Sequence, residues 1–295
     1  MASSSWANPF DHNFLREARH LLKINQPTAY DTGAQACKDR YSNLFQDDEL
    51  NIMVAFGYGD DYHTKVVSPE LAQTFRSMVA MPECPKGLNA CGFKRDPKNP
   101  EIYRKTIMTP DGKPHRVRLH FVSGAFTRNN DINVGALKAR QKAHCLDANR
   151  KFSQAISSGS EVVLYTGHAR NGGGPDFCPP IRKADGHTNY DFYEEKKLGV
   201  NVMHASLELA RARGVHNEIL GLFACSSQRH FLKELLEKTP ETGFLVTQNQ
   251  HSHLHMAFMA YASLDSILGG RCYKGFEESL KYGGVGRLRN MFPSK

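Results

Sequence analysis

Beyond residue 115, short strand-like runs alternate with longer amphipathic segments, and this alternation constrains the fold more than any other feature. The strand-like runs cover residues 116–126, 161–167, 217–225 and 243–248, of which 161–167 and 217–225 are continuously apolar, and the amphipathic segments cover 131–156, 199–214, 228–238 and 253–270. Side chains of a strand point alternately to opposite faces, so a continuously apolar strand is buried on both. The alternation predicts an α/β fold, a three-layer sandwich with a mostly parallel sheet between helices.

The first 115 residues are less regular. Helices are expected over 12–24 and 68–81, with a strand that runs into a polar turn over 49–63. Residues 82–114 are irregular and rich in proline, with a hairpin expected across 110–112. We therefore expect an N-terminal region at 1–115 and the α/β domain at 116–295. In that domain, the helix expected over 131–156 repeats Ile132, Leu137, Ala143 and Leu146 at helical spacing.

Composition narrows the possible partners. Hydrophobic residues make up 40% of the 295 residues, enough for a packed core, and no apolar run approaches the length of about 18 that spans a membrane. The net charge of +8 favours acidic partners, but the basic residues are scattered and no nucleic-acid-binding motif occurs. We expect no nucleic acid and no membrane span, and leave the oligomeric state open. The first ten residues lack the basic and apolar segments of an intact signal peptide.

The seven cysteines allow two interpretations. Cys84 and Cys91 flank a loop with proline and glycine, which a disulfide could close. Six paired cysteines and one free thiol would then indicate an oxidising compartment, periplasmic or secreted. Alternatively, several of them are reduced, buried thiols of a cytoplasmic protein. The pairing is left open among six positions: Cys37, Cys84, Cys91, Cys145, Cys178 and Cys272.

Two of the apolar strands end in residues that carry chemistry. The run at 161–167 ends in Gly167 and is followed by His168, and the run at 217–225 ends in Cys225. Ligands of open parallel sheets bind at the carboxyl ends of strands. With one intervening helix the two strands are expected to be neighbours, which brings a histidine and a cysteine to the same edge. They can then act as base and nucleophile.

The surroundings of Cys225 suit a reactive thiol. The thiolate is the nucleophile, and a nearby imidazole can take its proton. A helix is expected to begin near Ser227 or Gln228, and its positive end favours a thiolate. Backbone N–H groups near Gly167 to Ala169, at Cys225 and in the glycines after His168 could bind a developing oxyanion.

These residues resemble the caspase-like (clan CD) cysteine peptidases, the group of caspases, legumains and gingipains. In that group one hydrophobic strand ends in a catalytic histidine and a second ends in Ala-Cys or a similar pair, and here the counterparts are "VVLYTGH" and "ILGLFAC". The resemblance covers the layout of residues 116–270. It implies a caspase-like fold and a thiol protease, a hydrolase whose catalytic residues are His168 and Cys225. Its substrate would be a peptide or protein, and no metal or organic cofactor would be required.

The sequence departs from the family pattern in two places. His168 is followed by Ala169, where the family usually has glycine, and Cys225 is followed by Ser-Ser-Gln. The aspartate specificity of caspases is therefore not carried over. Gly172 to Gly174 open a long loop suited to a substrate wall, and Arg170, Asp176 and Ser226 are candidates for substrate binding.

Other functions remain open. The chain could be a non-catalytic caspase-like scaffold, or an amidase that uses the same Cys-His pair on cell-wall peptide. A metal site is a weaker alternative, because His251, His253 and His255 would share a face in a strand. A helix at that position brings together only His251 and His255. No phosphate-binding loop and no nucleophile-elbow motif of serine esterases occurs.

Overall fold

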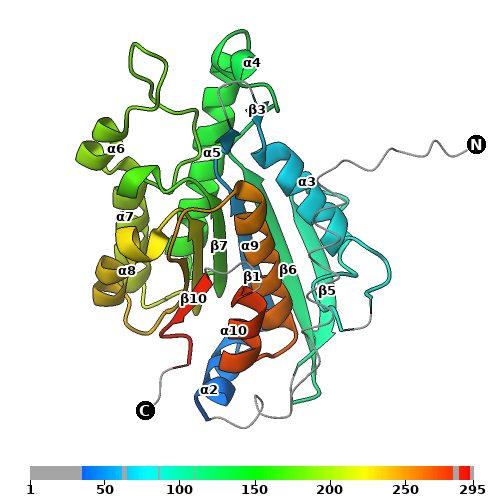
Figure 1. Ribbon diagram of the computed structural model, residues 1–295. Coiled ribbons are helices and arrows are strands. Elements are labelled where there is room, and N and C mark those ends of the chain that lie inside the picture. Colours follow the sequence, from blue (N-terminus) through cyan, green and yellow to red (C-terminus); the bar gives the residue numbers. More distant parts are fainter. Residues whose placement is uncertain (1–34, 62–64, 86, 110, 282–285, 293–295) are drawn as a thin grey trace, which may run out of the picture.

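The protein is described by a computed structural model that covers residues 35–61, 65–85, 87–109, 111–281 and 286–292 (Figure 1). The helix expected over 12–24 lies outside these residues. The strands that the structure describes are β1 (Glu49–Phe56), β2 (Asp60–Asp61), β3 (Lys65–Val66), β4 (Lys94–Arg95), β5 (Ile102–Met108), β6 (Pro114–Ser123), β7 (Val162–Gly167), β8 (Ile219–Ala224), β9 (Gly243–Thr247) and β10 (Gly286–Arg289). The helices are α2 (Gln35–Leu44), α3 (Ser68–Val79), α4 (Asn130–Val134), α5 (Lys138–Ser157), η1 (Arg170–Gly172), α6 (Tyr190–Lys196), α7 (Leu198–Ala212), α8 (Ser227–Lys238), α9 (His253–Leu268) and α10 (Tyr273–Lys281).

Of the ten described strands, β2 and β3 form a separate antiparallel pair, and the other eight form one mixed sheet, in the order β10-β9-β8-β7-β1-β6-β5-β4. Its five central strands, β9 to β6 in this order, run parallel. The remaining strands, β10, β5 and β4, add antiparallel pairs at the two edges. The hairpin expected across 110–112 is the turn between β5 and β6, so that prediction is confirmed.

Helices cover both faces of this sheet, as the α/β expectation requires (Figure 1). Along β1, Ile52 and Val54 face a core shared with α2, α3, α9 and α10. The alternate residues Met53 and Ala55 face the opposite core, which α5, α7 and α8 complete. The period of two in β1 therefore divides one strand between two buried layers, which explains why such strands are apolar throughout.

The central strand β1 comes from the region before residue 116. It pairs with β6 on one side and with β7 on the other. The residues on the two sides of the boundary expected at 115–116 thus belong to one sheet.

The single helix expected over 131–156 is wrong in two respects. It is divided into α4 and α5 by a break at Gly135, whose backbone is not helical. Ile132 and Leu146 are exposed, whereas the buried stripe of α5 includes Gln141, Cys145 and Phe152. Gln141 can be buried because its amide donates to the Gly124 carbonyl and accepts from the Phe126 N–H. The apolar residues alone therefore predicted the wrong buried face for this helix.

Six of the seven cysteines, all within the described residues, form disulfides. The pairs are Cys37–Cys272, Cys84–Cys91 and Cys145–Cys178, which leaves Cys225 free. This agrees with the expected closed turn between Cys84 and Cys91 and with the interpretation of six paired cysteines and one thiol. The Cys145–Cys178 disulfide fastens α5 to the loop after β7.

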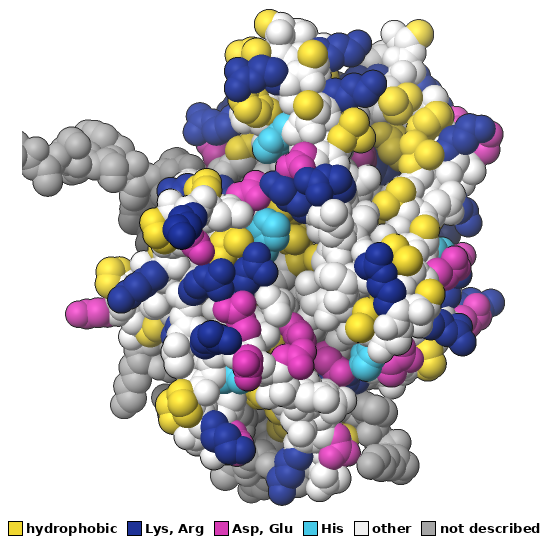
Figure 2. All heavy atoms as spheres, turned by 180° about the vertical axis from the view of Figure 1, so that it is seen from behind, with side chains coloured by type: hydrophobic (Ala, Val, Ile, Leu, Met, Phe, Trp, Pro, Cys, Tyr) yellow, Lys and Arg dark blue, Asp and Glu magenta, His cyan; other side chains and the backbone are white. Residues whose placement is uncertain are grey.

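The surface carries both signs of charge. On the face turned away in Figure 1, Lys and Arg side chains are interspersed with Asp and Glu (Figure 2). Among the described helices, none combines the length and the apolar composition needed to span a bilayer.

Candidate active site

The strands that precede His168 and Cys225 are neighbours, as predicted. The last residues of β7 and β8, Gly167 and Ala224, are register partners in a parallel ladder. His168 and Cys225 each follow the paired residue directly, so their backbones emerge side by side at the carboxyl edge, where adjacent strands lie about 4.8 Å apart. The Cys225 thiol is partly buried, with Sγ 3.9 Å from the His251 carbonyl oxygen.

The helix after Cys225 begins where the sequence predicts. Ser226 adopts a left-handed backbone with a φ of 52°, and α8 starts at Ser227. The Ser226 N–H donates to the Asn249 carbonyl, which ties this turn to the loop after β9. The first turn of α8 therefore presents its positive end beside the thiol. The substrate-binding role of Ser226 stays a prediction.

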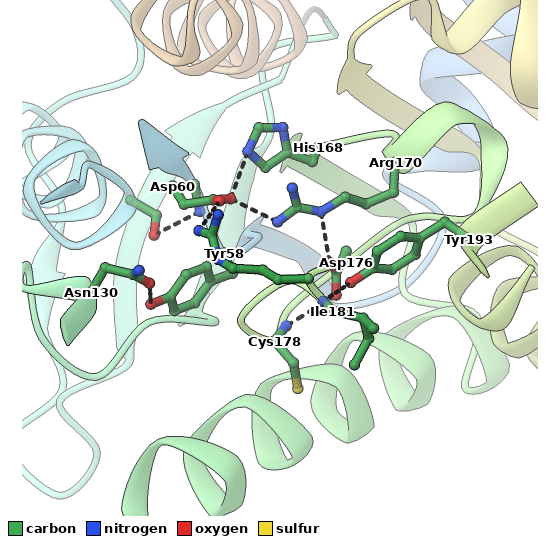
Figure 3. Close-up of polar contacts among 12 residues, drawn as sticks. Tyr58, Asp60, Asn130, His168, Arg170, Asp176, Cys178, Ile181 and Tyr193 are labelled. Carbon is green, nitrogen blue, oxygen red and sulfur yellow. Dashed lines mark hydrogen bonds and ion pairs between the residues drawn. The ribbon is translucent and has the colours of Figure 1, made fainter. Parts of the chain in front are cut away.

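A carboxylate that sequence reasoning did not select stands beside His168. Asp60, which follows β1, forms an ion pair through Oδ1 with His168 Nε2 at 3.1 Å (Figure 3). The same oxygen accepts from Arg170 Nη2 at 2.7 Å, and Oδ2 accepts from Arg182 Nη2 at 3.3 Å. The second ring nitrogen of His168, Nδ1, lies on the side away from Asp60 (Figure 3).

Asp60 is ionised although it is largely buried. Burial raises the pKa of its carboxyl, but the contacts with His168 and Arg170 outweigh burial and hold that pKa well below its ordinary value. An ionised carboxylate beside Nε2 favours a proton on that nitrogen, which leaves Nδ1 as an acceptor.

Arg170 forms ion pairs with this carboxylate and with a second one. Its side chain is 1% exposed and bridges two acids, with Nη2 on Asp60 and Nε 2.8 Å from Asp176 Oδ2. Charge pairing outweighs burial and raises the pKa of the guanidinium further. Asp176 is also an acceptor for the Cys178 N–H. The substrate-binding roles expected for Arg170 and Asp176 stay predictions. In the structure Arg170 pairs with Asp60, and Asp176 pairs with Arg170.

The glycines after His168 serve packing. Gly172 has a φ of +91°, and a Cβ on Gly173 would lie 2.5 Å from the Tyr193 carbonyl oxygen. The N–H groups of Gly172, Gly173 and Gly174 all donate to carbonyls of Ala169 or Arg170. These three amides are therefore engaged within the loop, and the expectation that they bind an oxyanion is wrong. The roles of Gly167, Ala169 and the Cys225 amide stay predictions.

A polar pocket opens beside the candidate base. Its volume is about 430 Å³, and its lining includes Asp60, His168, Arg170 and Arg182, together with His187 and Thr188 from the loop before α6 and Tyr190 at the start of α6. Ionised and hydrogen-bonding groups dominate this lining, so a polar side chain is the chemistry that it suits.

The histidines at 251–255 lie in and next to the start of α9. The ring of His251, which precedes α9, is 6.1 Å from that of His255, whereas His253 packs against His168 with ring centroids 4.5 Å apart. Across the described residues, no group of three or more His, Cys, Asp and Glu side chains is placed to hold a metal ion. The three histidines thus do not share one face.

The sequence shows that Asp60 and His253 lie near strand ends, but it does not show their contacts with His168. Asp60 lies four residues beyond the apolar run of β1, so the rule that strand ends deliver site residues applies to it as it does to His168. It was overlooked because the first 115 residues were treated as a separate region. His253 lies six residues after β9, at the first position of the following helix.

Comparison of the chain with protein-family models, with curated proteins and with solved structures found no match. The geometry of this edge is therefore the basis for assigning a function.

Proposed function

We propose that this protein is a caspase-like cysteine peptidase that hydrolyses peptide bonds with Cys225, His168 and Asp60. One observation carries the proposal: His168 and Cys225 follow register partners on adjacent parallel strands, and His168 is backed by an ionised carboxylate. Cys225 is also the one cysteine of the chain outside a disulfide.

In the proposed reaction, Cys225 Sγ gives its proton to His168 and attacks the scissile carbonyl carbon. The carbonyl oxygen becomes an oxyanion near the Cys225 amide. When the tetrahedral intermediate collapses, the C–N bond breaks and His168 donates the proton to the leaving amine. Water then attacks the thioester carbon and gives a proton to His168. The C–S bond breaks, the carboxylic acid product leaves, and His168 returns the proton to Cys225 Sγ. Asp60 touches neither substrate nor sulfur and acts as a positioning residue.

The caspase-like assignment is supported by the strand that delivers histidine, its neighbour that delivers cysteine, and the parallel sheet between two helical layers. The polar pocket beside His168 is proposed to receive a substrate side chain. Three disulfides in the described part of the chain favour an oxidising compartment, and we propose a periplasmic or secreted location.

A peptide library derived from a digested proteome, with new termini identified by mass spectrometry, tests the proposal. We expect cleavage by the wild type and a loss of at least about 10³-fold in rate for Cys225→Ala and for His168→Ala. His204→Ala is the matched control, because His204 is a partly buried histidine with a carboxylate partner, Glu234, on a helix outside the site. Its rate should equal that of the wild type.

The same experiment separates the alternatives. No cleavage of peptides, together with cleavage of isolated cell-wall peptide that depends on Cys225, would replace the peptidase with an amidase. The net charge of +8 makes an anionic polymer a reasonable substrate for that alternative. If neither peptides nor cell-wall peptide are cleaved, and Cys225→Ala leaves the binding of any partner unchanged, the protein would be identified as a scaffold.

A further inference from the structure

His253 occupies a rigid position next to the candidate base. It is the first residue of α9, whose start is capped by the Ser252 hydroxyl accepting from the His255 N–H. Every residue of α9 from Met256 to Leu268 is buried. A side chain mounted on such a helix has little freedom to move away from its contacts.

The ring of His253 lies next to His168 and next to Gly59, the residue before Asp60. It lies at 86° to the His168 ring, with the centroids 4.5 Å apart. Its Cε1 and Nδ1 atoms are each 3.3 Å from the position that a Cβ on Gly59 would occupy. The ring is therefore close both to the histidine and to the residue adjacent to the carboxylate that pairs with it.

His253 is neutral at this position. Burial lowers the pKa of its imidazole to about 3, and the neighbouring His168 and Arg170 add to the decrease while Asp60 opposes it. A neutral ring does not repel the imidazolium that His168 must become during the proposed reaction. The charged and titratable groups that act on His253 are His168, Asp60 and Arg170.

We propose that His253 is a positioning residue for His168, which holds the ring so that Nε2 stays on Asp60 and Nδ1 stays available to the thiol. This inference rests on the proposed function, because it assigns a role to His168. His168 can rotate about its Cβ–Cγ bond, and the perpendicular ring at 4.5 Å blocks that rotation on one side. The required property is a flat ring of this size, and the nitrogens of His253 are dispensable.

The test compares His253→Phe, which keeps a flat ring, with His253→Leu, which keeps apolar volume without it. The probe is alkylation of Cys225 by iodoacetamide under non-reducing conditions, since the remaining six cysteines are paired. At about pH 6, where a thiolate depends on its imidazole partner, His253→Leu should react about tenfold more slowly and His253→Phe within about threefold of wild type. His168→Ala gives the lower limit.

Thermal unfolding of both variants accompanies the rates, so that a slower reaction is assigned only to folded protein. Equal rates for Leu and wild type, or equally slow rates for Leu and Phe, would overturn the inference. Alkylation needs no peptide substrate, so it remains informative if the library is not cleaved. In that case a slow Leu variant and a fast Phe variant still support the positioning role, while the peptidase proposal fails. If cleavage occurs, the Leu variant should lower kcat and leave KM nearly unchanged.

Discussion

Two buried arginines lie at opposite ends of the parallel strands and bind different kinds of partner. Arg40 of α2, 6% exposed, lies at the amino end, and Arg170, 3% exposed, follows β7 at the carboxyl end. Arg40 donates to the carbonyl oxygens of Glu218, Glu241, Asn290 and Met291 and has one carboxylate partner, Glu218. Arg170 bridges two carboxylates, Asp60 and Asp176.

The two sets of partners indicate different roles for the two arginines. The partners of Arg40 are backbone oxygens at the starts of β8 and β9 and just after β10, so this arginine fastens chain segments together. Arg170 instead keeps two acids charged in a buried place, and one of them is the partner of His168. Its backbone is left-handed, with a φ of 44°, and Asn171 beside it has a φ of 53°. Backbone strain of this kind is found where a site needs an unusual geometry. A guanidinium bound mainly to carbonyls stabilises a fold, whereas one bound to carboxylates can also set the charge of a site.

Arg170→Met should have the largest effect of the variants that test this comparison. The variant leaves Asp176 without its arginine and removes one of the two arginines that contact Asp60. The free energy of unfolding should therefore fall by about 5 kcal/mol, the upper end for a broken buried ion pair. In the folded fraction, alkylation of Cys225 should slow about 100-fold, because Asp60 no longer holds His168. Chemical denaturation and alkylation rates measure the two effects.

Arg170→Lys is the matched control, since it keeps the charge but cannot bridge two carboxylates as a fork. It should fall between wild type and the methionine variant in both measurements. Wild-type reactivity in a folded Arg170→Met protein would show that this end of the sheet has no special role in the site.

Arg40→Met should lower stability by a smaller amount and leave the chemistry unchanged. Glu218 loses its arginine but keeps His216 at 2.7 Å, so the expected loss is about 3 kcal/mol, the lower end for a broken buried pair. The rate of Cys225 alkylation, measured well below the unfolding midpoint, should equal that of the wild type. A slowed reaction in this variant would mean that the two ends are coupled through the sheet.

The comparison also shows what sequence patterns can and cannot predict here. The continuously apolar runs predicted the strands and their parallel arrangement, and the alternation with helices predicted that β7 and β8 are neighbours. These features follow from burial on both faces, which is a local property of each run. The separation of Cys225 from the six paired cysteines was one of two interpretations that the sequence allowed.

The ion network was outside the reach of such patterns. Arg170 follows a strand end in a polar loop, where a charged residue is normally solvated, and its burial requires acids at positions 60 and 176. Only the fold brings residue 60 to residue 170, because β1 inserts between β6 and β7. For the same reason the contact of His253 with His168 depends on where α9 begins, and no local spacing encodes it.

The smallest expected effects concern pH, and the two ends should respond in opposite directions. At the amino end, the hydrogen bond to Glu218 raises the pKa of His216 above its ordinary value of 6.5, although burial opposes the increase. The folded protein thus binds this proton more tightly than the unfolded chain does. The resulting stability is complete below about pH 6.5 and is lost as the pH rises through the higher folded pKa.

At the carboxyl end the sign is reversed. Burial and His168 lower the pKa of His253 to about 3 from 6.5, so between these values only the unfolded chain binds the proton. Stability should therefore fall as the pH decreases from about 6.5 towards 3. At pH 4 the full shift would correspond to about 3.5 kcal/mol, and because the ring is partly exposed we expect about 2 kcal/mol. His253→Phe should remove this loss of stability at acid pH.

His216→Gln should remove the loss of stability at alkaline pH, which amounts to no more than about 0.5 kcal/mol because His216 is more than one-third exposed. Denaturation of both variants from about pH 4 to 8 measures these slopes, and parallel curves for wild type and His253→Phe would contradict the neutral, buried state assigned to His253.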